Sequence, residues 1–244
     1  MFDHVTLRVA DLAASRAFYE TVLGAIGRRA PSAGEQFTEW DDFSIAPAEP
    51  DQPATHSVHI GFRTRSEDEV KAFWRAGTSA GYVSDGAPGP RPEYGEDYFG
   101  GFLLDPDGNS AEAVWLGREL TSPALIDHVW VRVADLGESR RFYRAIAPTL
   151  GLELDDKHRE RFSIRGDDRS LSLVHDERPV SERVHIAFPA QDNAVVHGFY
   201  RAGMAAGFSP NGAPGERPQY HAGYYSAFVL DPDGNNIEAV NHNR

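Results

Sequence analysis

The sequence predicts an α+β fold of curved, largely antiparallel sheets with helices packed on the outside. Three observations predict it: the chain repeats itself, each half holds two alternating strands that are each followed by an amphipathic helix, and short strands broken by turn signals follow every helix. The opening stretch DHVTLRVADL (3–12) returns as DHVWVRVADL (127–136). Two duplicated halves are therefore expected, joined near residues 117–125, each with the order strand, helix, several strands used twice.

Amphipathic stripes and capping residues locate the four helices. Asp11 is the expected N-cap of the first helix, Ser66 with Glu69 forms a capping-box pattern for the second, and Asp135 with Glu138 repeats the first arrangement. The apolar faces are expected to hold, in chain order, Leu12, Phe18, Tyr19, Val22 and Leu23; Val70, Phe73 and Trp74; Phe142, Tyr143 and Ile146; and Val195, Val196, Phe199, Tyr200 and Met204.

The motif DPDGN occurs twice, at 105–109 and 231–235. The residue before proline is held extended, aspartate caps the turn, and glycine accepts a positive φ, so both copies predict tight turns between strands.

Composition and charge narrow the range of possible functions and partners. With 37 acidic against 24 basic residues the formal net charge is −13, which repels nucleic acid phosphates and anionic membrane surfaces. No stretch approaches the roughly 18 apolar residues of a membrane span, and the first residues lack the layout of a secretory signal, so we expect a cytoplasmic protein. Its expected partner is a small-molecule substrate, and a homodimer is left open. Because cysteine is absent, histidine, aspartate and glutamate are the strong metal ligands available.

Alternation along the strands decides what each side chain faces. The apolar set of each strand must meet the helices, so the polar set lines the opposite, concave face. The residues expected on that face are His4, His59, His128, His185, Glu112 and Glu238.

An ionised glutamate inside a sheet concavity is costly unless a cation pairs with it. Two neutral imidazoles and one carboxylate can leave about half of an octahedral shell open, as in non-haem Fe(II) oxygenases. The sequence therefore predicts a divalent metal site in at least one half, formed by His4, His59 and Glu112 in the first or by His128, His185 and Glu238 in the second. The plainer alternative is a set of hydrogen-bonded histidines and solvated glutamates, but the recurrence of all three positions favours metal binding.

These stretches resemble the vicinal oxygen chelate superfamily, which contains glyoxalase I, fosfomycin- and bleomycin-resistance proteins, methylmalonyl-CoA epimerase and extradiol dioxygenases. The resemblance is carried by DHVTLRVADLAASRAFYETVLG, VHIGF and DPDGNSAEAV in the first half and by DHVWVRVADLGESRRFYRAIAPTLG, VHIAF and DPDGNNIEAV in the second. It covers essentially the whole chain. It implies four βαβββ modules that form two tandem glyoxalase/bleomycin-resistance/dioxygenase-like domains with curved mixed sheets, over residues 1–118 and 125–244.

The resemblance also implies ligand positions, and the chain departs from parts of the family. The first-strand ligand falls on His4 or His128, the third-module ligand on His59 or His185, and the carboxylate on Glu112 or Glu238. Extradiol dioxygenases usually keep metal only in their C-terminal half, and the position of their acid–base tyrosine is Phe228 here, with Phe102 in the first half. The fourth ligand of glyoxalases and epimerases has no counterpart in residues 43–48, and residues 171–177 offer only His175 or nearby acids. A three-ligand site fits oxygenases and fosfomycin-type transferases better.

A loop near the C-terminus supplies the candidates for substrate contact or proton transfer. They are Arg217, Tyr220, His221, Tyr224 and Tyr225. The alternative is a well-packed structural loop. The first-half copy has Gly95 where the second half has His221, which favours the second half as the better-equipped active site. Arg8 and Arg132 are expected either to hold a carboxylate or enolate or to pair with surface acids.

Three functions remain open from the sequence. The leading one is a metal-dependent enzyme that binds substrate through adjacent oxygens and activates dioxygen, with Fe(II) favoured and Mn, Zn, Ni or Co as alternatives; a lyase, isomerase or thiol transferase is the enzymatic alternative. The second is a non-catalytic protein that sequesters a planar aromatic drug or metabolite, as bleomycin-resistance proteins do. The third is a degenerate structural repeat.

Overall fold

The computed structural model of the chain describes residues 1–29, 32–33, 37–119 and 123–244. It divides into two compact units: unit 1 contains Met1–Thr6 and Val131–Arg244, and unit 2 contains Leu7–Trp130. The division falls inside two strands, β1 (His4–Val9) and β9 (Ile126–Arg132). The predicted segments 1–118 and 125–244 stay a prediction about the sequence repeat, and residues 120–122 of the junction lie outside the described residues.

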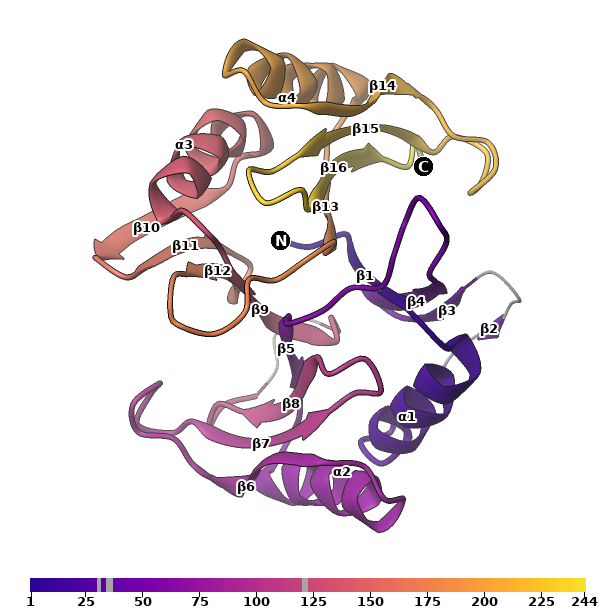
Figure 1. Cartoon of the computed structure of the whole chain (residues 1–244), viewed down its shortest axis with the longest axis vertical. Helices are drawn as coiled ribbons and strands as arrows, with labels where there is room; N and C mark the ends of the chain where they lie inside the picture. The colour runs from indigo at the N-terminus through magenta and orange to yellow at the C-terminus, as the bar shows by residue number, and fades with distance from the viewer. Residues whose placement is uncertain (30–31, 34–36, 120–122) are drawn as a thin grey trace. The chain divides into compact units, whose positions relative to one another are not determined.

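The elements follow the predicted order of four βαβββ modules (Figure 1), which confirms the fold class. Unit 2 holds the end of β1, the start of β9, and α1 (Leu12–Gly24), β2 (Ser32–Ala33), β3 (Thr38–Trp40), β4 (Phe43–Pro47), β5 (His59–Arg63), α2 (Glu67–Ser79), β6 (Ser84–Pro90), β7 (Phe99–Leu104) and β8 (Ser110–Trp115).

Unit 1 holds the first residues of β1, the end of β9, and the third and fourth modules. Its elements are α3 (Leu136–Ile146), the 3₁₀ helix η1 (Ala147–Leu150), β10 (Glu153–His158), β11 (Arg161–Gly166), β12 (Arg169–Val174), β13 (His185–Pro189), α4 (Asn193–Ala205), β14 (Pro210–Glu216), β15 (Tyr225–Leu230) and β16 (Asn236–Asn241).

Each unit contains a run of five paired strands, and corresponding strands follow the same order in the two runs. In unit 2 the order is β9-β5-β8-β7-β6, and in unit 1 it is β1-β13-β16-β15-β14. The pairs β5–β8 and β13–β16 are parallel, and the other pairs in these two runs are antiparallel. Helix α2 packs against β7 and β8, and α4 against β15 and β16 (Figure 1). One face of each sheet is therefore covered by a helix, and the ligand side chains lie on the other.

The predicted helix caps are confirmed. Asp11 accepts hydrogen bonds from two backbone amides of the first turn of α1, Asp135 does the same for α3, and the Ser66 hydroxyl accepts from the amide of Glu69. The Glu69 carboxylate accepts from the backbone of Arg65 instead of Ser66, so the capping box is only half formed. Most residues of the predicted apolar faces are buried, namely Phe18, Tyr19, Val22, Leu23, Val70, Phe73, Phe142, Tyr143, Ile146, Val196 and Phe199. The others are half-buried, namely Leu12, Trp74, Val195, Tyr200 and Met204. No helix among the described residues is long and apolar enough to cross a membrane.

Both DPDGN motifs form the predicted turns, and they also align the strands that carry the site. Asp105 accepts from the amides of Asp107 and Asn109, and Gly108 has a φ of +82°. The Asn109 side chain then accepts from the amide of Val58. This contact places the first residue of β5 beside the first residue of β8, and Asn235 makes the same contact with Val184 in unit 1.

Candidate metal centres

In unit 2, three neighbouring strands place a carboxylate and two imidazoles on one face. The register sets Glu112 of β8 beside Gly61 of β5, and Gly61 opposite His128 of β9. His59 lies two residues before Gly61 on the same face. A Cβ at Gly61 would lie 2.3 Å from the His128 ring, so the His128 ring occupies the space that a side chain at this middle position would need.

These three residues, the unit 2 centre, have their donor atoms at nearly equal separations. His59 Nε2 lies 3.0 Å from Glu112 Oε2 and 3.1 Å from His128 Nε2, and the third edge, from His128 Nε2 to Glu112 Oε2, is 3.2 Å. Glu112 is fully buried and His128 is nearly so.

Unit 1 builds the same constellation from β1, β13 and β16, and we name His4, His185 and Glu238 the unit 1 centre. Ala187 occupies the middle position, paired with His4 on one side and Glu238 on the other. His185 Nε2 lies 3.0 Å from Glu238 Oε2 and 3.2 Å from His4 Nε2, and the third edge is 3.6 Å. The imidazoles are more exposed than in unit 2, at 22% and 19% against 13% and 7%.

The predicted grouping by halves is wrong, although all six predicted residues lie in the two clusters. His4 joins His185 and Glu238 of the second half, and His128 joins His59 and Glu112 of the first half. The reason is strand pairing: the first strand of each half pairs with the histidine strand of the other half, β1 with β13 and β9 with β5.

The donor set fits a divalent ion of the kind that accepts nitrogen and oxygen. Bonds of about 2.1 Å at right angles place neighbouring ligand atoms about 3.0 Å apart. The edges of 3.0–3.2 Å in the unit 2 centre match that spacing, and those of the unit 1 centre are close to it. Among the described residues each cluster has three donor residues.

Hydrogen bonds behind the imidazoles of unit 2 fix which ring nitrogen carries hydrogen. His128 Nδ1 lies 3.0 Å from Asp127 Oδ1, and an acceptor-only carboxylate there requires Nδ1–H. His59 Nδ1 lies 3.1 Å from the hydroxyl of Ser110, which itself donates to Asp85, so Nδ1 of His59 must donate to it. Both Nε2 atoms therefore present a lone pair to the centre when the rings are neutral.

Behind His4 in unit 1 lies a row of hydrogen bonds that ends at an accessible side chain. His4 Nδ1 is 2.8 Å from Asp3 Oδ1, Asp3 Oδ2 is 2.9 Å from His242 Nε2, and His242 Nδ1 is 2.8 Å from His221 Nε2. We name Asp3, His242 and His221 the histidine chain. His185 Nδ1 instead faces the neutral amide of Asn236.

In each centre the carboxylate and the neighbouring imidazoles stabilise each other's charged forms. Burial raises the pKa of Glu112, but hydrogen bonds from His128 and His59 outweigh it and set the pKa at about 2. Burial lowers the pKa of His128, whereas hydrogen bonds to Asp127 and Glu112 raise it to about 10. In unit 1, burial raises the pKa of Glu238, but the interactions with His185 and His4 outweigh burial and lower this pKa. Without an ion, the proton on His128 takes the place of the positive charge, and ion binding must displace it.

A tyrosine donates to the carboxylate of each centre. The Tyr98 hydroxyl lies 2.9 Å from both oxygens of Glu112, and the Tyr224 hydroxyl lies 2.8 Å from Oε1 of Glu238. Burial, followed by the neighbouring carboxylate, raises the pKa of both phenols well above the usual range, so both stay protonated and act as donors.

The five loop candidates divide by position. Tyr224 touches the unit 1 centre, His221 reaches it through the histidine chain, and Tyr220 is 61% exposed with its ring centroid 4.9 Å from that of Tyr224. Tyr225 and Arg217 do not belong to the centre. Tyr225 alternates with Tyr224 and faces α4, where its hydroxyl lies 2.8 Å from His197, and Arg217 donates to carbonyls of its own loop.

The remaining sequence candidates have structural contacts. Arg8 donates to the carbonyl of Pro47 and to the Gln52 side chain, and Arg132 lies 3.4 Å from Asp176. His175 Nδ1 lies 3.0 Å from the carbonyl of Val133.

Sequence reasoning missed the residues behind the ligands. Asp3 and Asp127 directly precede the first-strand histidines, and this repeated Asp-His pair was a usable signal. The small residue two positions after His59 and His185 was another. Arg63, whose Nε donates to Asp127 over 3.0 Å, had no signal because its counterpart in the repeat is Pro189.

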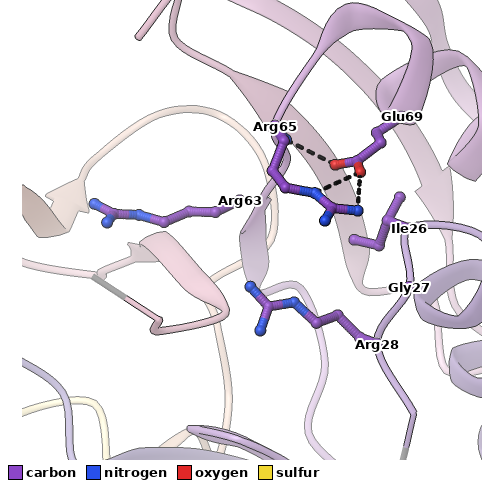
Figure 2. Close-up of a pocket in the computed structure, with 6 residues that line it drawn as sticks. All are labelled: Ile26, Gly27, Arg28, Arg63, Arg65 and Glu69. Carbon is purple, nitrogen blue, oxygen red and sulfur yellow. Dashed lines mark hydrogen bonds and ion pairs between the residues drawn. The ribbon is translucent and has the colours of Figure 1, made fainter. Parts of the chain in front are cut away.

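Unit 2 also has a pocket of about 230 Å³, and none of the six ligands lines it. Figure 2 shows the residues that line this pocket. The pocket is lined by Ile26, Gly27, Arg28, Arg63, Arg65 and Glu69. Its three guanidinium groups each pair with a carboxylate, of Asp41, Asp127 and Glu69 respectively. The pocket therefore holds balanced charge, and its link to the unit 2 centre is Arg63.

The two sheets each carry two imidazoles and a carboxylate at a spacing that fits a divalent ion, in an α+β fold of repeated βαβββ modules. The family model of the Glyoxalase/Bleomycin resistance protein/Dioxygenase superfamily matches residues 1–113 and 125–239. The chain belongs to this superfamily.

Solved structures agree on the fold. Glyoxalase I from Zea mays is 19% identical, with 99% of this chain and 92% of that chain covered at a TM-score of 0.66. A Bacillus subtilis protein provisionally named a dioxygenase is 12% identical, with 98% and 84% covered at a TM-score of 0.65. Comparison with curated proteins gives no match.

Proposed function

We propose that this protein is a divalent-metal-dependent enzyme whose unit 1 centre performs dioxygenase-type chemistry on a small substrate bound through two adjacent oxygens, with Fe(II) as the favoured ion. One observation carries the proposal: His4, His185 and Glu238 offer two nitrogens and one oxygen at the corners of a triangle with edges of 3.0–3.6 Å. Such a set occupies one side of an ion and leaves about half of its positions for small molecules.

Bound in this set, an iron ion would supply a Lewis acid and a binding position for dioxygen next to the substrate. Side chains around the centre orient the ligands. Asp3 holds His4 with its Nδ1–H turned away from the centre, so that Nε2 presents its lone pair. Tyr224 keeps its proton and donates to Oε1 of Glu238, which orients the other oxygen toward the imidazoles.

The histidine chain gives the unit 1 centre a route for proton movement. His221 Nε2 and His242 Nδ1 are 2.8 Å apart, and an imidazole has two ring nitrogens that can each donate or accept a hydrogen bond. His221 is the member at the outer end, half-buried, and Asp3 is the member that touches His4. Unit 2 has Arg63 where unit 1 has His242 as the partner of the aspartate, and an arginine does not release its proton.

A second candidate function is favoured by the surroundings of the unit 2 centre, namely the binding of a planar aromatic molecule without turnover. The Trp130 ring lies 6.3 Å from that of His59 and 5.7 Å from that of Tyr94, which is 50% exposed. The corresponding residue in unit 1 is Thr6. Exposed aromatic rings beside a metal centre suit stacking against a flat ligand.

Metal content tests the proposal. Protein purified anaerobically is expected to contain, or to take up, Fe(II), and Fe(II), Mn(II), Co(II), Ni(II) and Zn(II) are each expected to raise the midpoint of thermal unfolding. Nitric oxide added to Fe(II)-loaded protein should give the S = 3/2 electron paramagnetic resonance signal of an ion with an open position. Loss of that signal in His4→Ala but not in His128→Ala would assign the open position to unit 1. Protein that takes up none of these ions would leave the aromatic-binding function in its place.

A further inference from the structure

The two centres differ at one position on the strand next to the carboxylate. Gly100 of β7 and Ser226 of β15 each lie two residues after the tyrosine that donates to the carboxylate. Ser226 pairs with Val240, which lies two residues beyond Glu238 on β16, and Gly100 pairs with the matching valine of β8. A side chain at this position therefore lies on the face that carries the ligands.

In unit 2 the position has no room for a side chain. A Cβ at Gly100 would lie 2.2 Å from Glu112 Oε1 and 3.2 Å from Cε1 of Tyr98. The Glu112 carboxylate thus lies directly over bare backbone. Its two oxygens are equally placed for the Tyr98 hydroxyl, at 2.9 Å each.

In unit 1 the same position carries a hydroxymethyl group. Ser226 is completely buried, and its Oγ has no hydrogen-bond partner among the residues that the structure describes. The Glu238 carboxylate cannot occupy the place that Glu112 takes, and Tyr224 bonds its Oε1 over 2.8 Å. A buried hydroxyl without a partner destabilises the folded chain, so one that lies beside a candidate metal centre calls for an explanation.

We propose that Ser226 is a positioning residue of the unit 1 centre: its hydroxyl donates to the Glu238 carboxylate when a divalent ion draws that carboxylate onto the imidazoles, and so holds Glu238 to ligation through one oxygen. The inference rests on the proposed metal binding by unit 1. In unit 2, Gly100 and the evenly shared Tyr98 hydroxyl leave Glu112 free to present both oxygens. Single-oxygen ligation leaves one more position open for small molecules, and this sets unit 1 apart from unit 2.

The test uses Co(II) as the probe in a His59→Ala parent, which confines binding to unit 1. Ser226→Ala removes the hydroxyl alone, and Ser226→Gly reproduces the unit 2 arrangement. We expect Ser226→Ala to lower Co(II) affinity about tenfold or more, as loss of a partner of a ligand does, and to change the visible absorption band of the bound ion. The same substitution should raise the unfolding midpoint of the metal-free protein by about 2–4 °C, because it removes an unpartnered buried hydroxyl.

Ser139→Ala is the matched control. Ser139 is also completely buried in unit 1, but its hydroxyl donates to the Asp135 carbonyl in α3, away from the centre. It should leave the Co(II) affinity and spectrum unchanged. Ser226→Gly should weaken Co(II) at least as much as Ser226→Ala without the gain in metal-free stability, because glycine adds backbone freedom to the unfolded chain.

The two proposals fail in different ways. A parent that binds Co(II), with affinity and spectrum unchanged by Ser226→Ala and Ser226→Gly, overturns the role of Ser226 and leaves the metal centre standing. A spectrum changed only by Ser226→Gly also overturns it, because the methylene group and not the hydroxyl would then act. A parent that binds no Co(II) overturns both.

Discussion

The unit 1 and unit 2 centres have the same three donor atoms and different residues behind them. In unit 2 a buried ion pair, Arg63 with Asp127, backs one imidazole, and Ser110 with Asp85 backs the other. In unit 1 the corresponding positions hold titratable or neutral groups, namely the histidine chain behind His4 and the Asn236 amide behind His185. Unit 2 therefore backs one imidazole with a fixed guanidinium charge, whereas unit 1 backs the matching imidazole with two further imidazoles. The residues behind the ligands, more than the ligands, decide what each centre can do.

The largest effect is expected from the pairing of ligands across the two halves. His4→Ala should remove the ion of one centre, and adding Glu238→Ala should remove no further ion because both belong to unit 1. Combining His4→Ala with Glu112→Ala should abolish metal binding, because the two residues serve different centres. Equilibrium dialysis with Zn(II) measures the ions bound per chain. Pairing within halves would give the opposite results for the two double variants, and circular dichroism controls for folding.

Arg63 should matter more for stability than its functional counterpart in unit 1. Its side chain is 3% exposed, so Arg63→Met leaves the buried Asp127 charge without its guanidinium and should lower the free energy of unfolding by about 3–5 kcal/mol. His242→Ala, which removes the partner of the less buried Asp3, should cost only about 1 kcal/mol. Urea denaturation measures both. Arg65→Ala, at a 72% exposed side chain, is the control, and an equal loss in all three variants would contradict the comparison.

The DPDGN turn of unit 1 makes the stability of the folded chain depend on pH. Burial, opposed by hydrogen bonds from Asn235, raises the pKa of Asp231 to about 6 from a usual value of 3.8. The folded state therefore favours the protonated acid, so its contribution to stability is complete below about pH 4 and is lost as pH rises through 6. Asp231→Asn should remove this loss, worth at most about 3 kcal/mol.

Chemical denaturation between pH 4 and 7 measures the difference between Asp231→Asn and wild type. The difference should grow in favour of the variant as pH rises across this window. A constant difference would show that the carboxyl does not titrate there.

The smallest effect concerns two matched tyrosines of α1 and α3. Tyr19 donates to Asp105 over 2.9 Å, whereas the buried Tyr143 hydroxyl has no hydrogen-bond partner among the described residues. Tyr19→Phe should cost about 1–2 kcal/mol, and Tyr143→Phe should be neutral or stabilise slightly, since it removes an unpartnered polar group. Thermal unfolding separates them. Equal losses would indicate that Tyr143 has a partner in solution.

Local patterns predicted most of the fold. The helix caps, the apolar stripes and the DPDGN turns depend on residues a few positions apart, so the sequence could reveal them. Alternation also predicted correctly that the four histidines and two glutamates share the face opposite the helices. The face on which a side chain lies is set by alternation within its own strand, so the sequence of that strand is enough to predict it.

Partner choice could not be predicted in the same way. DHVTLRV and DHVWVRV are nearly identical, as are VHIGF and VHIAF, so alternation permits either first strand to pair with either histidine strand. The roles of Arg63 and His242 could not be predicted for a related reason. Each contacts an aspartate that is distant in sequence and is brought close by strand pairing.

Because β1 and β9 each give their histidine to a centre completed by the other half, neither half can assemble a full ligand set by itself. Two fragments cut between Leu116 and Ile126 would each carry an incomplete set, and metal uptake would return only when the fragments reassociate. An ancestral polypeptide of half this length would have needed a second copy of itself to complete either centre. Joining two copies in one gene would have made that dimer permanent and allowed the two centres to diverge.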